Sequence, residues 1–137
     1  MKNFVLVVED YPLWRGEIVQ ALEGRGFRAE GVSHPFSALD RLREVSPDAI
    51  LTDLHLPGMD GLMFYERSQI FAPKTPFVFV SVCPEAFLSR FPDRGNFLIL
   101  RWPLKDEDLD RAVRHLLTQK GDDRGRLVPR ARNPLHE

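Results

Sequence analysis

The chain has 137 residues, 43% of them hydrophobic and 28% charged, which is the composition of a folded globular domain with one core. Its formal net charge of -1 provides no broad positive surface, so we expect no direct binding to nucleic acid or to an anionic membrane. The single cysteine, Cys83, excludes an internal disulfide and a cysteine-rich zinc site, and we assign it no role.

The first third of the chain alternates between strand and helix patterns. Residues 4–8 (FVLVV) form a short β-branched run, which predicts a strand buried on both faces. Pro12 then stands where a first helical turn tolerates proline, and apolar residues recur at helical spacing until Gly24. Residues 27–32 predict a weaker strand, and the amphipathic helix that follows it ends before Pro47.

The rest of the chain repeats this alternation of short apolar runs and amphipathic stretches. The predicted elements are, in chain order, a strand at 49–52, a helix at 61–71, a strand at 77–82, a short proline-bounded helix at 84–91, a strand at 97–100 and a helix at 105–119. This alternation indicates an α/β fold in which an open, mostly parallel sheet is covered by helices on both faces. We predict one domain over residues 1–119 and a mobile C-terminal tail over residues 120–137, where no periodicity is visible.

Acidic residues follow two of the predicted strands. Glu9 and Asp10 come directly after the first strand, and Asp53 comes directly after the third. Ligands of doubly wound sheets bind beyond the carboxyl ends of the strands, so neighbouring strands would bring these carboxylates together. Two like charges about 4 Å apart cost roughly 4 kcal/mol at an effective dielectric near 20, which requires either a cation or a raised pKa. An oxygen-only site of this kind suits Mg²⁺.

Asp53 also has a second predicted role. A carboxylate can accept a phosphoryl group as an aspartyl phosphate when a metal offsets the incoming charge. Pro57 and Gly58 would hold the following loop clear of this reaction. Ser81, at the end of the fourth predicted strand, is placed to donate its hydroxyl to a phosphoryl oxygen.

Together these residues resemble the receiver domains of two-component response regulators. The resemblance rests on Glu9-Asp10, on the stretch DLHLPGMDG that begins at Asp53, on Ser81 and on Pro103, and it covers about residues 1–119. It implies a flavodoxin-like sheet of five parallel strands in the order 2-1-3-4-5. It also implies a regulatory switch in signal transduction and no enzymatic turnover.

The resemblance further implies a site and partners. Asp53 would accept a phosphoryl group from a phosphohistidine on a sensor histidine kinase or a phosphotransfer protein. Mg²⁺ would bind to Glu9, Asp10, Asp53 and the main-chain carbonyl of His55, while the His55 side chain would lie at the rim of the pocket. In such a phosphorelay the hydroxyl of Ser81 would turn inward to the phosphoryl group.

Three positions depart from the family pattern. Trp102 occupies the place of a lysine that usually precedes the proline, here Pro103, and neither Arg101 nor Lys105 is a convincing substitute. Val82 is larger than the residue usual after Ser81, which would narrow access to the pocket and slow both phosphorylation and hydrolysis. Ile99 replaces an aromatic residue that commonly takes part in the switch. We also predict a cis bond between Trp102 and Pro103.

These departures leave alternatives to a phosphorylated receiver. The first is a phosphorylation-independent pseudo-receiver that acts as a protein interaction module because Trp102 fills the place of the lysine. The second is an aspartate-nucleophile phosphatase, which is disfavoured because such enzymes carry an Asp where this chain has His55. Acetyl phosphate labelling distinguishes a phosphorylated receiver from a pseudo-receiver. Failure to hydrolyse aryl phosphates would exclude the phosphatase.

The sequence leaves the downstream partner open. A homodimer is compatible with the resemblance, and the tail is too short to provide a DNA-binding output domain. The N-terminal apolar run is too short for a signal peptide or a membrane span, so we expect a cytoplasmic protein.

Overall fold

Five short strands pair side by side in the computed structural model, which describes residues 1–119 of the chain. All neighbouring pairs are parallel, and their order across the sheet is β2-β1-β3-β4-β5, as the receiver resemblance implied. The predicted tail at residues 120–137 lies outside the described residues. The strands are β1 (Phe4–Val8), β2 (Arg28–Val32), β3 (Ala49–Asp53), β4 (Phe77–Ser81) and β5 (Phe97–Arg101).

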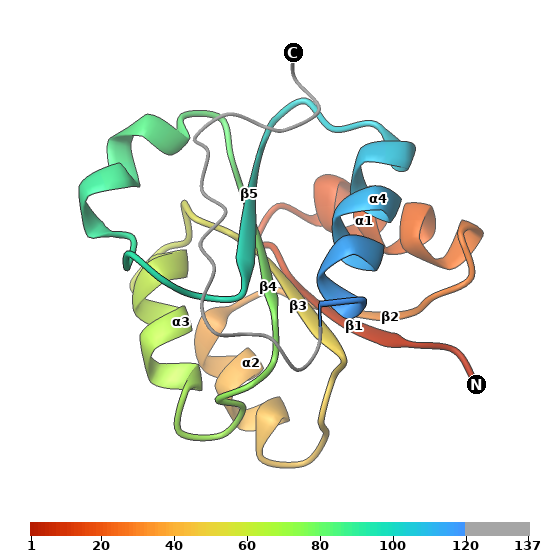
Figure 1. Cartoon of the computed structure of the whole chain (residues 1–137), viewed down its shortest axis with the longest axis horizontal. Coiled ribbons are helices and arrows are strands. Elements are labelled where there is room, and N and C mark those ends of the chain that lie inside the picture. Colours follow the sequence, from red (N-terminus) through yellow and green to blue (C-terminus); the bar gives the residue numbers. More distant parts are fainter. Residues whose placement is uncertain (120–137) are drawn as a thin grey trace.

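Helices cover both faces of the sheet (Figure 1). One face packs against α1 and α4, and the other packs against α2, α3 and η1. Within residues 1–119, no helix has the length and apolar character that a membrane span requires. The helices are α1 (Pro12–Gly24), α2 (Pro35–Leu42), α3 (Gly61–Ser68), the 3₁₀-helix η1 (Pro84–Arg90) and α4 (Asp106–Leu117).

The strands are buried on both faces, as their uninterrupted apolar runs predicted. Every residue of β1, β3 and β4 is buried, whereas the edge strand β2 is partly exposed. Side chains alternate across a strand, so Val5 and Val7 of β1 face α1 and α4, while Leu6 and Val8 face α2 and α3. Two apolar layers therefore hold the carboxyl ends of the strands at one edge of the sheet.

Three predicted helices differ from the observed ones. The short helix after β4 is a 3₁₀-helix, because Pro84 begins it, its first turn has no side-chain cap, and Pro92 follows it closely. The helix expected to reach Phe71 ends at Ser68, whose hydroxyl donates to the carbonyl of Tyr65 at 2.7 Å and competes with the backbone bonds. The helix before Pro47 ends early at Leu42 in a turn.

Candidate functional site

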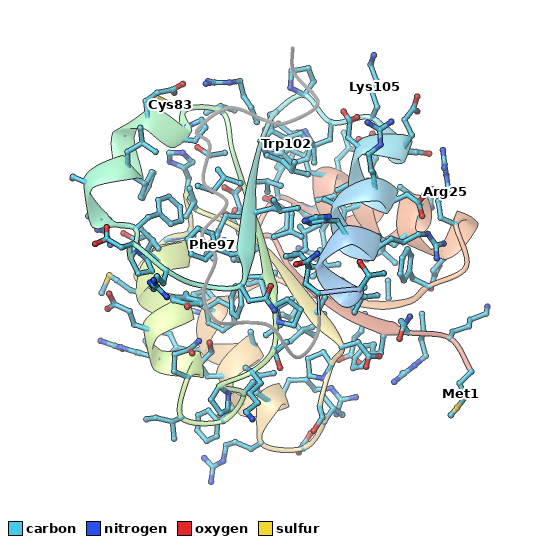
Figure 2. All side chains as sticks on the ribbon, in the orientation of Figure 1. Met1, Arg25, Cys83, Phe97, Trp102 and Lys105 are labelled. Carbon is cyan, nitrogen blue, oxygen red and sulfur yellow. The ribbon has the colours of Figure 1, made fainter. Side chains whose placement is uncertain are left out.

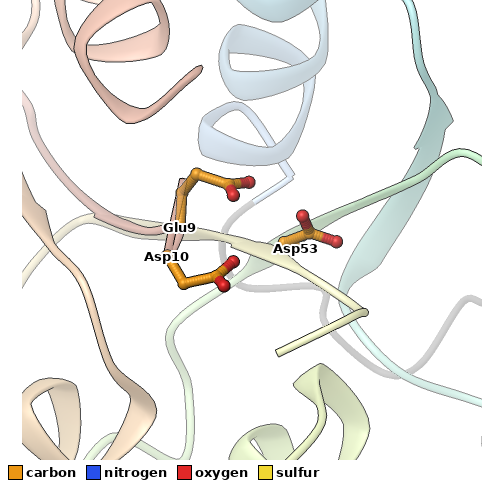
Figure 3. Close-up of side chains that lie close together, drawn as sticks. All are labelled: Glu9, Asp10 and Asp53. Carbon is orange, nitrogen blue, oxygen red and sulfur yellow. The ribbon is translucent and has the colours of Figure 1, made fainter. Parts of the chain in front are cut away.

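Three carboxylates meet at the carboxyl edge of the sheet (Figure 3). β1 and β3 are neighbours in the sheet, so Glu9 and Asp10 follow one strand directly beside Asp53, the last residue of the other. One oxygen from each carboxylate lies within 4.8 Å of the others. Glu9 is only 1% exposed and Asp53 only 5%, whereas Asp10 is exposed. The structure thus brings together the three acids that the sequence placed at separate strand ends.

Glu9 carries the largest electrostatic cost of this arrangement. Burial, the adjacent Asp53 carboxylate and the charge of Asp10 raise the pKa of Glu9 to about 8, although the Tyr11 backbone N–H opposes the shift. That N–H donates to Oε2 at 3.0 Å, while Oε1 is buried and has no partner among the described residues. A proton shared by Glu9 and Asp53 would remove the repulsion between the two carboxylates. The cluster therefore requires either a proton or a cation.

The donor set of the cluster fits a hard divalent cation. Glu9, Asp10 and Asp53 offer only oxygen atoms, and Mg²⁺ is commonly held by one or two carboxylates together with water. The unpartnered Oε1 of Glu9 supplies an oxygen that nothing else in the described chain satisfies. Within residues 1–119, none of the ion pairs involves any of these three acids. No lysine or arginine of residues 1–119 therefore forms an ion pair with the cluster.

The loop after β3 fixes the carboxylate of Asp53. The backbone N–H of His55 donates to Asp53 Oδ1 at 2.8 Å, which orients the side chain at the strand end. Gly58 adopts a φ of 82°, a conformation that glycine accepts readily, so the loop turns back toward the sheet. At Gly61 a Cβ atom would lie 2.5 Å from the carbonyl oxygen of Asp53, so α3 can begin against the end of β3 only with glycine.

We expect Gly61→Ala to destabilise the protein by about 1–3 kcal/mol, because the added methyl group pushes on the backbone of β3. Urea denaturation measures this change. Gly16→Ala is the matched control, since a Cβ at that position in α1 meets nothing within 4 Å. The control should be neutral or slightly stabilising, and an equal loss in both variants would contradict the prediction.

The hydroxyl of Ser81 lies at the end of the neighbouring strand. β4 pairs with β3 so that Val80 is opposite Asp53, and Ser81, which follows, is fully buried. Its Oγ accepts a hydrogen bond from the Cys83 N–H at 2.8 Å and lies 2.7 Å from His55 Nε2. The imidazole, expected at the rim of the pocket, is thus hydrogen-bonded to the hydroxyl, and nothing in the sequence indicated this pair.

Comparisons with known proteins agree with this geometry. The sequence model of the response regulator receiver domain family matches residues 5–114. The chain belongs to this family. The receiver protein of Sinorhizobium medicae WSM419 superimposes with a TM-score of 0.76 at 24% identity, covering 85% of this chain and 95% of that one. The receiver domain of sensor histidine kinase PA1611 from Pseudomonas aeruginosa gives a TM-score of 0.75 at 23% identity, covering 86% and 99%.

Curated relatives of this receiver are longer proteins. A protein-glutamate methylesterase/protein-glutamine glutaminase of Anaeromyxobacter dehalogenans is 40% identical over 63 residues, which are 46% of this chain and 18% of that protein. The transcriptional regulator NtrC of Escherichia coli K12 is 29% identical over 82% of this chain and 24% of its own length. The sensor kinase CckA of Brucella abortus is 29% identical over 85% and 13%. The chain therefore spans less than a quarter of the length of each of these three relatives.

Trp102 follows β5 of the receiver domain (Figure 2). Its bond to Pro103 is cis, as predicted. Its ring lies against that of Trp14, with centroids 4.7 Å apart, and packs on the apolar layer between the sheet and helices α1 and α4. The indole Nε1 is buried and has no partner among the described residues. An aromatic stack thus stands where the family usually places an ammonium group.

Neither Arg101 nor Lys105 replaces that ammonium group. Arg101 forms an ion pair with Glu85 of η1, and its guanidinium lowers the pKa of Glu85 to about 2. Lys105 is exposed, and Figure 2 shows its side chain extending away from the ribbon. The expectation that both residues are poor substitutes agrees with these positions.

Two residues of α1 that contact predicted site residues were missed from the sequence. Trp14 forms the stack with Trp102, and Arg15 Nη1 donates to the main-chain oxygen of Glu9 at 2.9 Å. Their positions in the first turn of α1, directly after the acid pair, were the available signal. Of the remaining departures, Val82 is 56% exposed at the end of β4, and Ile99 is buried in the apolar layer beneath α2 and α3.

Proposed function

We propose that this receiver accepts a phosphoryl group on Asp53 from a phosphohistidine of a sensor histidine kinase or phosphotransfer protein. Mg²⁺ would be held by Glu9, Asp10, Asp53 and the main-chain carbonyl of His55. The observation that carries the proposal is the cluster of three carboxylates without a paired cation, in which a buried Glu9 oxygen lacks a partner. The outcome is a change of conformation passed to a protein partner, and not turnover of a substrate.

The chain's own residues prepare the transfer. The His55 N–H donates a hydrogen bond to Asp53 Oδ1. The other carboxylate oxygen, Oδ2, would then be the atom that attacks the phosphorus atom. The new O–P bond forms as the N–P bond of the donor breaks, and the donor imidazole keeps that electron pair and takes a proton. Bound Mg²⁺ would supply positive charge that offsets the phosphoryl oxygens.

Two relatives support the metal and the partner. The receiver domain of sensor histidine kinase PA1611 carries a magnesium ion coordinated in its active site cleft. The sensor kinase CckA of Brucella abortus contains a segment similar to residues of this chain, which links such receivers to histidine kinases. Both similarities favour phosphotransfer over an unrelated use of the acids.

Acetyl phosphate labelling tests the proposal. We expect about one phosphoryl group per chain in the presence of Mg²⁺, detected by intact mass, and none when EDTA removes the metal. Asp53→Asn is the control, since the asparagine side chain has nearly the size of aspartate but its amide cannot form an acyl phosphate. Labelling that persists in Asp53→Asn would place the acceptor elsewhere and contradict the assignment.

A pseudo-receiver is the second candidate, and Trp102 is the observation that favours it. No described lysine or arginine pairs with the acids, and the indole ring fills the position of the missing ammonium group. In that case the domain would bind its partner without phosphorylation. Absence of Asp53-dependent uptake of phosphate or beryllofluoride at saturating Mg²⁺ would decide for the pseudo-receiver.

A further inference from the structure

We propose that His55 is a positioning residue for the Ser81 hydroxyl, and that this pair sets the lifetime of the phosphoryl group on Asp53. The inference rests on the proposed phosphorylation of Asp53. His55 Nε2 lies 2.7 Å from Ser81 Oγ, a short hydrogen-bond distance. The ring holds the hydroxyl in its resting place and opposes its turn toward a phosphoryl oxygen.

The hydroxyl has few alternatives in this position. Ser81 is fully buried, so its polar atoms depend on partners in the chain. One lone pair of Oγ accepts from the Cys83 N–H at 2.8 Å. A hydroxyl offers a single proton, and in the tautomer whose Nε2 accepts a hydrogen bond, His55 and a phosphoryl oxygen compete for that proton. Turning Ser81 toward Asp53 therefore requires the bond to His55 to be lost or rearranged.

His55 is itself held between the acceptor and η1. Its backbone N–H donates to Asp53 Oδ1 at 2.8 Å. Its ring meets the edge of the Phe87 ring, with centroids 5.0 Å apart and planes at 83°. The ring is thus fixed on one side by the residue that accepts the phosphoryl group and on the other by η1.

A second contact fixes η1 against the same loop. Nη1 and Nη2 of Arg90 donate hydrogen bonds to the carboxylate of Asp60, at 2.8 and 3.1 Å. Asp60 also caps α3 through the N–H of Met63 at 2.9 Å. Phe87, which lies within η1, therefore stays beside the His55 ring, and the ring cannot leave Ser81 without displacing this packing.

His55→Phe isolates the hydrogen bond from the packing. Phenylalanine keeps a ring of similar size beside Phe87 but has no Nε2, so Ser81 is freed to reach the phosphoryl group. A hydrogen bond of this kind changes an equilibrium by about threefold to tenfold, and we expect the half-life of phosphorylated Asp53 to lengthen by that factor. The measurement follows loss of the phosphoryl group by intact mass after removal of acetyl phosphate.

Ser81→Ala provides the control for a merely structural role. In the Ser81→Ala background, adding His55→Phe should leave the half-life unchanged, because the hydroxyl that His55 positions is gone. An unchanged half-life in His55→Phe alone, or the same lengthening in both backgrounds, would overturn the proposal.

An NMR readout does not depend on phosphorylation. The Cys83 amide donates to Ser81 Oγ, so its resonance should shift in His55→Phe without any phosphodonor. A Cys83 resonance that does not move overturns the positioning role. If the wild type takes up no phosphoryl group, the proposed function fails, and the amide measurement alone decides whether His55 positions Ser81.

Discussion

Metal-free protein is expected to lose on the order of 4 kcal/mol of its free energy of unfolding as the pH rises from 5 to 9. The cause is Glu9, because its burial beside Asp53 and Asp10 raises its pKa to about 8 from an ordinary value of 4.5. Between these two values the folded protein holds a proton that the unfolded chain releases. The stabilisation is complete below pH 4.5 and is lost at about 1.4 kcal/mol per pH unit as the pH approaches 8.

Mg²⁺ should remove most of this loss, because the cation takes the place of the proton between the carboxylates. Urea denaturation at pH 5, 7 and 9, with EDTA or with Mg²⁺, measures both effects. Glu9→Gln is the control, since a neutral amide should flatten the pH dependence and weaken the response to Mg²⁺. Stability that rises with pH, or an equal slope in Glu9→Gln, would show that Glu9 does not carry the proton.

The sequence predicted the sheet and the meeting of the acids well. β1, β3 and β4 are short apolar runs bounded by polar or turn residues, and such runs leave few alternatives to buried parallel strands. Once two of these strands are neighbours, the residues that follow them share an edge. The positions of Glu9, Asp10 and Asp53 therefore follow from strand order alone.

The direction of individual side chains was less predictable. The pairing of His55 with Ser81 depends on how two loops after different strands turn, and no local pattern specifies that geometry. The contact of Trp14 with Trp102 likewise joins α1 to the end of β5, two elements that are far apart in the sequence. The end of α3 was predicted wrongly for a related reason. The Ser68 hydroxyl can bond to several nearby backbone groups, and the sequence does not show that it bonds to the Tyr65 carbonyl and ends the helix there.

The charge of the acid cluster is related to the residue at position 102, where the family usually has a lysine and this chain has an aromatic ring. A lysine beside the acids would have lowered the pKa of Glu9 and paired with Asp53, whereas Trp102 contributes apolar packing without charge. The chain thus retains a proton on its acids or depends on a bound cation. We expect this dependence on a proton or a cation to be stronger than in family members that carry the lysine.

Trp102→Lys should restore the missing charge and change both the stability and the labelling of the site. A positive group within about 4–6 Å lowers the pKa of a carboxyl by roughly one to three units. We therefore expect the pH-dependent loss of stability to move toward lower pH by that amount and to become smaller. Labelling of Asp53 by acetyl phosphate at limiting Mg²⁺ should also become faster, because the ammonium group offsets part of the incoming charge.

Trp102→Met is the matched control, because the methionine side chain is unbranched and similar in length to that of lysine but carries no charge. Both variants lose the stack on Trp14, an aromatic contact that contributes about 0.5–1.5 kcal/mol beyond the area it buries, so both should be similarly less stable at pH 5. Only the lysine variant should change the pH dependence and the labelling rate. Identical behaviour of the two variants would mean that a side chain at residue 102 does not reach the acids, and the missing ammonium group could then not explain how the site works.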